Sequence, residues 1–182
     1  MQKSTASAGP KTSKAGAVDA ISILTEDHAK VKKLFRQYES AKESGSAEDK
    51  ATIAAEICSE LTAHATAEEE IFYPAVRAAI DDDELLNEAD VEHASAKDLI
   101  AQISESNPDD DLYDAKVKVL AEYIDHHVKE EEGEMFPKAR KGKLDLASLG
   151  AEIEARKDEL LAEMAGETVE DLAPKSRGGA KR

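Results

Sequence analysis

The two halves of this chain repeat one arrangement of metal-ligating side chains: a single histidine, followed further along by a His-x-x-x-Glu pair. The residues of this pattern are His28, His64, Glu68, His93, His127 and Glu131. The single histidine recurs after 65 residues and the pair recurs after 63. Of the five histidines in the chain, only His126 lies outside the repeat. A duplicated unit of this kind predicts a site for two metal ions.

Helical spacing explains how these side chains can meet. Residues four apart lie on the same face of a helix, so His64 and Glu68 can reach one centre, and the second pair can reach it from a facing helix. Two carboxylates on buried faces are unfavourable unless their charge is balanced. Two divalent ions supply that balance, with each carboxylate bridging them and two histidines ending on each ion. Imidazole with carboxylate favours iron, manganese or zinc over calcium or magnesium, and the absence of cysteine ligands argues against structural zinc.

The elements that must hold these residues are long amphipathic helices. Apolar residues recur at intervals of three and four, and His28 and His93 each fill the same gap in such a row. The expected helices cover residues 19–44, 47–80, 83–106, 112–138 and a stretch beyond Gly142. Pro74 and Pro137 should kink or end their helices. Short connections predict an all-α, up-down-up-down four-helix bundle, with a fifth C-terminal amphipathic helix as packing or a lid.

Composition and charge agree with this class. Hydrophobic residues make up 41% and aromatic residues 4% of 182 residues, and Cys58 is the single cysteine. We expect a bundle over residues 18–140, a C-terminal helix over 141–166, and disordered basic tails over 1–17 and 167–182. The ends, residues 1–17 and 174–182, hold seven positive charges, so the formal net charge of −16 leaves about −23 between them.

An acidic body of this kind attracts cations and repels nucleic acid, so contact with nucleic acid is expected, if at all, through the basic tails. No apolar run reaches the length of about 20 residues that a membrane span needs. The N-terminal residues also lack the apolar core of a signal peptide. We therefore expect a soluble cytoplasmic protein without a membrane partner.

The pattern resembles the hemerythrin HHE cation-binding family, over roughly residues 19–140. The resemblance implies a non-haem di-iron site in a four-helix bundle, with manganese or zinc as alternatives, held by the six residues of the repeat. Oxygen-carrying hemerythrins use five histidines, including a His-x-x-x-His pair on the third helix, whereas His93 is followed here by Lys97. The ligand set is more similar to that of bacterial proteins that repair iron centres or handle nitric oxide, peroxide and iron under stress.

Several neighbours of the six residues have competing interpretations. Glu60 and Tyr123 each lie one turn before a ligand histidine, and we expect them to contact the ligands or, for the phenol, a bound small molecule. The flanking glutamates are expected to form a solvated face; they are Glu69, Glu70, Glu130 and Glu132. A pairing of His126 with Glu130 would keep the four-residue spacing but breaks the 63-residue repeat.

Three functional hypotheses follow from the sequence. The first is a metal-binding protein that senses, stores or consumes oxygen, peroxide or nitric oxide at a di-iron site, rather than a dedicated enzyme. The second is a di-iron enzyme that consumes peroxide or repairs iron centres. The third is a structural or adaptor bundle that contacts a partner through the fifth helix and the tails.

Overall fold

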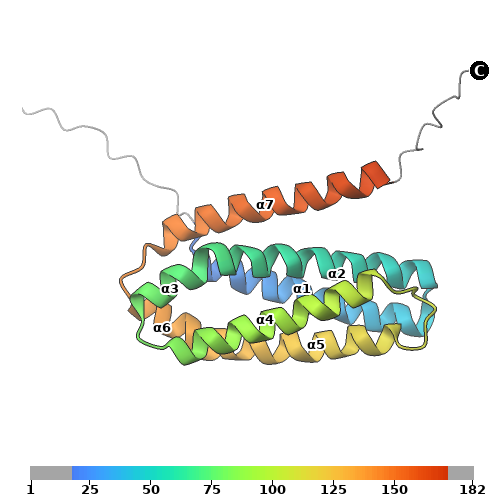
Figure 1. Ribbon diagram of the computed structural model, residues 1–182, viewed down its shortest axis with the longest axis horizontal. Helices are drawn as coiled ribbons and strands as arrows, with labels where there is room; N and C mark the ends of the chain where they lie inside the picture. The colour runs from blue at the N-terminus through green and yellow to red at the C-terminus, as the bar shows by residue number, and fades with distance from the viewer. Residues whose placement is uncertain (1–17, 172–182) are drawn as a thin grey trace, which may run out of the picture.

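The computed structural model describes residues 18–171, and this part of the chain is helical without any strand (Figure 1). The helices are α1 (Ala20–Ser44), α2 (Ala47–Ala67), α3 (Tyr73–Ala79), α4 (Asp83–Ser104), α5 (Tyr113–Glu130), α6 (Phe136–Lys141) and α7 (Leu146–Asp171), with π-helical turns η1 (Glu68–Phe72) and η2 (Glu131–Met135). The expected all-helical class is confirmed. Helix α7 continues beyond residue 166, where we expected it to end. The tails at 1–17 and 172–182 lie outside the described residues.

Four long helices, α1, α2, α4 and α5, lie side by side along the molecule, and α7 packs against α1 and α2 (Figure 1). Side-chain caps begin α1, α2 and α4 and satisfy backbone N–H groups that have no partner inside the helix, whereas α5 begins without one. Asp19 accepts a hydrogen bond from the Ser22 N–H at 2.9 Å at the start of α1. Ser46 and Asp49 form a reciprocal capping box at the start of α2. The turn predicted between α1 and α2 therefore has a clear physical basis.

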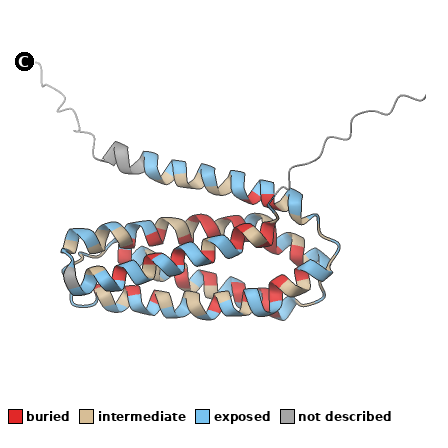
Figure 2. Cartoon of the chain, turned by 180° about the vertical axis from the view of Figure 1, so that it is seen from behind, coloured by how far each residue is buried: buried red, intermediate tan, exposed pale blue. Residues whose placement is uncertain are grey.

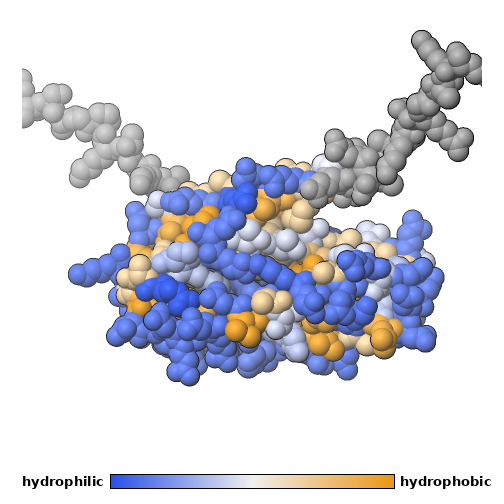
Figure 3. Space-filling model, viewed as in Figure 1, coloured by the Kyte–Doolittle hydropathy of each residue, from blue (hydrophilic) through white to orange (hydrophobic). Residues whose placement is uncertain are grey.

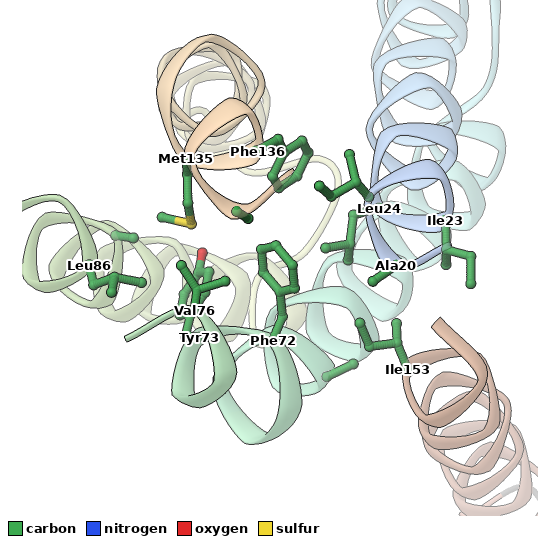
Figure 4. Close-up of a cluster of buried hydrophobic side chains, with 14 of the residues drawn as sticks. Ala20, Ile23, Leu24, Phe72, Tyr73, Val76, Leu86, Met135, Phe136 and Ile153 are labelled. Carbon is green, nitrogen blue, oxygen red and sulfur yellow. The ribbon is translucent and has the colours of Figure 1, made fainter. Parts of the chain in front are cut away.

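The interior contains two apolar clusters, one toward each end of the bundle. Figure 4 shows the first, in which Phe72 and Phe136 pack edge to face with ring centroids 5.7 Å apart. The second cluster surrounds Tyr38 and Leu120, nearer the other end. The four histidines of the repeat lie in sequence between the members of these two clusters, one on each long helix. Buried residues face inward along all four long helices (Figure 2).

Pro74 and Pro137 were expected to kink or end their helices, and the chain passes through a π-helical turn before each proline and continues as a helix after it. The two prolines cannot donate a backbone hydrogen bond, and one residue separates each of them from the end of a π-helical turn. The Tyr73 N–H bonds to the Glu68 carbonyl, five residues earlier, and the chain then continues as α3. The wider turn accommodates one extra residue at the point where a carboxylate of the repeat enters the interior.

Helix α7 is held close to the start of α1. Its Ile153 is fully buried, and Gly150 approaches the backbone so closely that a Cβ atom there would lie 2.5 Å from the Val18 carbonyl oxygen. The rest of α7 is largely exposed on its outer side (Figure 2). Among residues 18–171, no helix combines the length and apolarity that crossing a membrane requires.

Candidate metal centre

The six residues of the repeat meet in the middle of the bundle. The structure brings together the side chains of His28, His64, Glu68, His93, His127 and Glu131, each at most 6% exposed. They come from all four long helices and from the first residue of each π-helical turn. They are also the buried polar residues of the described part of the chain, so its interior polar groups are concentrated at one place.

Each carboxylate lies between two histidines. Glu68 Oε2 is 3.1 Å from His64 Nε2 and 3.5 Å from His93 Nε2. Glu131 Oε2 is 3.2 Å from His28 Nε2 and 3.5 Å from His127 Nε2. These separations are those of neighbouring ligand atoms about 2.0–2.2 Å from a shared ion.

The six residues therefore divide into two centres that share the carboxylates. His28 and His64 belong to one centre and His93 and His127 to the other, with the two ligands of the latter 3.0 Å apart. Two histidines therefore lie in each group, and each carboxylate lies close to histidines of both groups.

Unsatisfied polar atoms show that the residues suit metal ions. His28 Nε2, His64 Nε2, both carboxylate oxygens of Glu68 and Glu131 Oε2 are buried without a hydrogen-bond partner among the described residues. Burying such groups without a partner is costly, whereas lone pairs that converge on one point suit a cation. The residues present therefore fit a pair of metal ions.

A carboxylate on the outside orients each ligand histidine. On two helices this carboxylate directly precedes a ligand: Asp27 Oδ2 lies 3.1 Å from His64 Nδ1, and Glu92 Oε2 lies 2.7 Å from His127 Nδ1. The two carboxylates are 65 residues apart, so they belong to the repeat. A carboxylate that accepts the Nδ1–H leaves the lone pair on Nε2, which faces the centre.

The other two histidines are oriented from the π-helical turns. Glu69 Oε1 lies 3.0 Å from His93 Nδ1, and Glu132 Oε1 lies 2.9 Å from His28 Nδ1. These glutamates directly follow Glu68 and its repeat partner. Each orienting carboxylate thus neighbours a ligand on its own helix and holds the histidine of the next helix, which closes a ring around the bundle.

This finding corrects the expectation that the flanking glutamates form only a solvated face. Glu69 and Glu132 contact histidines of the repeat, and they are themselves 63 residues apart. Lys97, in place of the histidine that oxygen carriers have, lies 2.7 Å from Glu69 Oε1. Lys157 of α7 pairs with Asp27 in the same way. The fifth helix therefore reaches the surroundings of the centre.

Tyr73 makes the two centres different. Its hydroxyl donates to Glu131 Oε1 at 2.9 Å and lies 3.2 Å from His93 Nε2. Burial and the two nearby carboxylates raise the pKa of this phenol well above 10, so it remains a donor. Phe136, its partner in the repeat, instead stacks on His28 with ring centroids 5.8 Å apart.

The charges inside the centre compensate one another. Burial opposes a charged imidazole at His64, but Glu68 and Asp27 outweigh it and raise its pKa to about 10. Burial also opposes ionisation of Glu131, but the adjacent His28 imidazole, with its Nε2 3.2 Å from Glu131 Oε2, and the other imidazole charges hold its pKa at about 2. Protons on imidazole and divalent metal ions are therefore alternative counterions for the same carboxylates.

The two residues expected beside the ligands lie elsewhere. Tyr123 is 49% exposed, because it projects from the outer side of α5. The Glu60 carboxylate forms an ion pair with the Lys30 ammonium, 2.6 Å away. The buried phenol at the centre is Tyr73, the residue directly before Pro74, which the sequence did not single out.

The alternative pairing of His126 with Glu130 is not the buried one. The His126 side chain is 62% exposed, whereas that of His127 is 5% exposed. His126 lies on the outer surface of α5, where it contacts Glu92 and Glu130. The register that preserves the repeat is therefore the one that enters the interior.

A small cavity of about 20 Å³ adjoins the four ligand histidines. Its other walls are mainly apolar and include Val31, Leu61, Ala96, Ile100, Ile124 and Val128. This volume corresponds to about one water-sized molecule. A larger groove of about 600 Å³ between α1 and α5 shares His28, Ile124 and Val128 with it. These shared side chains separate the small cavity from the groove.

Comparison with known proteins identifies the family. The Hemerythrin HHE cation binding domain matches residues 19–139, which cover the four long helices and extend into α6. The chain therefore belongs to the hemerythrin HHE cation-binding domain family, whose domains bind metal cations. The resemblance stated from the sequence is confirmed.

Two known proteins are similar to this chain. The crystal structure of a hemerythrin HHE cation binding domain-containing protein from Mycobacterium kansasii matches with a TM-score of 0.69 and 25% identity, covering 88% of this chain and 95% of that one. A protein of Nostoc sp. described as a DNA nickase is 30% identical over 118 residues. That match covers 65% of this chain but 32% of the Nostoc protein, so the chain corresponds to about a third of it.

Proposed function

We propose that this protein holds a non-haem di-iron site within an up-down-up-down bundle of four helices and uses it to bind oxygen, peroxide or nitric oxide. The six ligands are His28, His64, Glu68, His93, His127 and Glu131. The observation that carries the proposal is the pair of buried glutamates, each lying between histidines of both centres. When bound, an iron pair supplies open coordination positions and electrons for chemistry with oxygen-containing ligands.

The protein surroundings support a small ligand. The cavity beside the histidines holds about one water-sized molecule and has largely apolar walls, which excludes large or charged substrates. The orienting carboxylates fix each imidazole, so that its Nε2 stays directed at the centre. Manganese or zinc would suit the same ligands, and the metal is therefore part of the test.

A peroxide-consuming enzyme is the second candidate, and Tyr73 favours it. A phenol that donates to Glu131 at 2.9 Å, beside two ligand histidines, can hydrogen-bond an oxygen atom of a bound ligand. The DNA-nicking activity named for the Nostoc relative is not transferred to this chain. The match spans about a third of that protein, and a body with a charge of about −23 repels DNA.

The test is metal analysis of protein produced with iron, together with absorption spectra before and after addition of air, nitric oxide or peroxide. We expect about two irons per chain and a spectrum that changes with the ligand. Glu68→Gln should lose most of the metal. Glu60→Gln is the matched control, because it removes the same charge from the same helix at a residue that pairs with Lys30.

The outcomes separate the hypotheses. Continuous release of oxygen or loss of many equivalents of peroxide favours the enzyme, whereas one ligand per centre favours binding. Protein that retains no metal, or loses none in Glu68→Gln, would contradict the di-iron proposal and favour a structural bundle.

A further inference from the structure

Helix α7 covers only one of two equivalent faces of the bundle. The repeat relates α1 and α2 to α4 and α5, and α7 packs against the first pair (Figure 1). On this covered face, the Lys157 ammonium pairs with Asp27, the carboxylate that orients His64. On the other face, Glu92 occupies the position of Asp27, and no described helix covers it. Asp27 therefore has a lysine partner on α7, whereas Glu92, its equivalent in the second half, has no covering helix that supplies one.

The face of the bundle that α7 leaves uncovered carries different residue types from the face that α7 covers. Under α7, helix α2 presents Ala63 and Ala67, both fully buried. The residues 63 positions later are His126 and Glu130 of α5, so two small residues are replaced by two that can ligate metals. Figure 3 shows that the molecular face in this view is mostly hydrophilic, with scattered apolar side chains.

Glu92, His126 and Glu130 form an outer group, whose side chains lie close enough together to bind a single cation. His126 Nε2 lies 3.3 Å from Glu130 Oε1 and 3.4 Å from Glu92 Oε1. Ligand atoms at about 2.0–2.1 Å in a tetrahedral zinc site are separated by about 3.3 Å, which matches the two distances from His126. All three ligand atoms lie within 4.8 Å of one another, so they can converge on one ion. Glu92 and His126 also border a surface hollow of about 330 Å³, through which solvent and ions can enter.

The charges around Glu92, His126 and Glu130 also favour a bound cation. Within residues 18–171, neither Glu92 nor Glu130 forms an ion pair with a lysine or arginine, and their charged-group contacts are with imidazoles. Two carboxylates around one imidazole carry a net negative charge, even when that imidazole is protonated. The equivalent point on the covered face holds the Lys157 ammonium. A cation is therefore the group that the uncovered face lacks.

We propose that Glu92, His126 and Glu130 form a further metal site that binds a divalent transition-metal cation such as Zn²⁺, with water completing its ligands. This site is separate from the buried pair but joined to it by one residue. Glu92 faces the outer ion with Oε1 and accepts the Nδ1–H of His127 with Oε2 at 2.7 Å. An ion in the outer site withdraws charge from Glu92 and so weakens its polarisation of His127.

Zn²⁺ binding to the full-length, iron-loaded protein tests this proposal, with calorimetry for affinity and metal analysis for zinc and iron. We expect one zinc per chain beyond the metal of the buried centre. His126→Ala and Glu130→Gln should weaken that binding by more than about tenfold. Glu122→Gln is the control, because it removes the same charge from an exposed position of α5 that pairs with Lys118.

Equal zinc binding by the wild type and by both variants would overturn the proposal, as would the absence of any zinc beyond the buried centre. Unchanged iron content and unfolding temperature in Glu130→Gln would show that the fold and the buried centre are intact. The readout is a difference between variants at the surface, so it does not depend on which metal occupies the buried centre. Failure of the di-iron proposal would appear in the iron content instead.

Discussion

Tyr73 donates a hydrogen bond of 2.9 Å to Glu131 from the repeat position that Phe136 occupies in the second half of the chain. Duplication produced two similar centres, and this pair of residues makes them unequal. One centre has a hydroxyl donor beside its histidines, and the other has an aromatic ring stacked on His28. Ligands that accept a hydrogen bond should therefore prefer the centre of His93 and His127.

Tyr73→Phe should make the two centres more alike. We expect retention of metal but a changed absorption spectrum and weaker binding of peroxide, because the hydrogen-bond donor is lost. The free energy of unfolding should fall by about 1–3 kcal/mol, as for a buried hydrogen bond to a charged group. Tyr38→Phe is the control, since it removes a 2.6 Å bond to Asp114 outside the centre. Identical spectra and ligand affinities in Tyr73→Phe and the wild type would contradict the assigned role.

Gly150→Ala should detach the start of α7 from the bundle. A Cβ atom there would lie 2.5 Å from the Val18 carbonyl oxygen and 2.9 Å from the Ala20 nitrogen, and backbone atoms cannot move aside cheaply. Exposure of Ile153 alone costs about 1.5–3 kcal/mol. This loss corresponds to a lower unfolding temperature by about 2–4 °C for each kcal/mol.

Gly166→Ala provides the comparison within the same helix. A Cβ atom at Gly166 meets nothing within 4 Å, so the substitution should stabilise α7 by up to about 1 kcal/mol through helix propensity. Because Lys157 pairs with Asp27, Gly150→Ala should also weaken metal binding, while Gly166→Ala leaves it unchanged. Equal melting temperatures for the two variants would show that α7 does not depend on the close approach at Gly150.

Ile124→Ala should speed the entry of small ligands. Ile124 borders both the small cavity beside the histidines and the larger groove between α1 and α5. Shortening it opens the partition between these spaces without changing a ligand residue. We expect a higher association rate for nitric oxide, measured by stopped-flow absorption, with little change in metal content. Val119→Ala, a half-exposed position on α5, should leave the rate unchanged. A rate unaffected by Ile124→Ala would place the entry route elsewhere.

The sequence predicted which six side chains meet in the interior, because the repeat places them at constant offsets. The carboxylates that orient the histidines also follow these offsets: Asp27 and Glu92 are 65 residues apart, and Glu69 and Glu132 are 63 apart. Adjacent acidic residues are common on solvated helices, so Glu69 and Glu132 could not be separated from ordinary surface glutamates. Each of them contacts a histidine on another helix, and this contact depends on how the four helices are arranged in space.

Helix geometry explains why Tyr73, and not the expected Tyr123, lies beside the six residues of the repeat. At about 100° per residue, Leu120 lies about 20° from His127 toward the interior, whereas Tyr123 lies about 40° in the opposite sense. Tyr73 would lie about 140° from Glu68 in a regular helix, but the extra residue of the π-helical turn reduces this to about 40°. Spacing rules for α-helices could not anticipate that turn, although the proline after it was the available signal.

Asp114 gives the fold a dependence on acid that is separate from the metal centre. Burial opposes its ionisation, but it accepts hydrogen bonds from Tyr38 at 2.6 Å and Lys50 at 3.0 Å, and these lower its pKa below 3.8. A carboxyl whose folded pKa is lowered contributes stability that is present above its unfolded pKa and is lost as pH falls through the folded pKa. Asp114→Asn should therefore cost about 1 kcal/mol near pH 7, and the difference from the wild type should shrink below about pH 4. Thermal melts between these pH values measure the difference, with Asp111→Asn in the neighbouring exposed loop as the control. A difference that stays constant or grows toward low pH would show that the charge of Asp114 does not stabilise this end of the bundle.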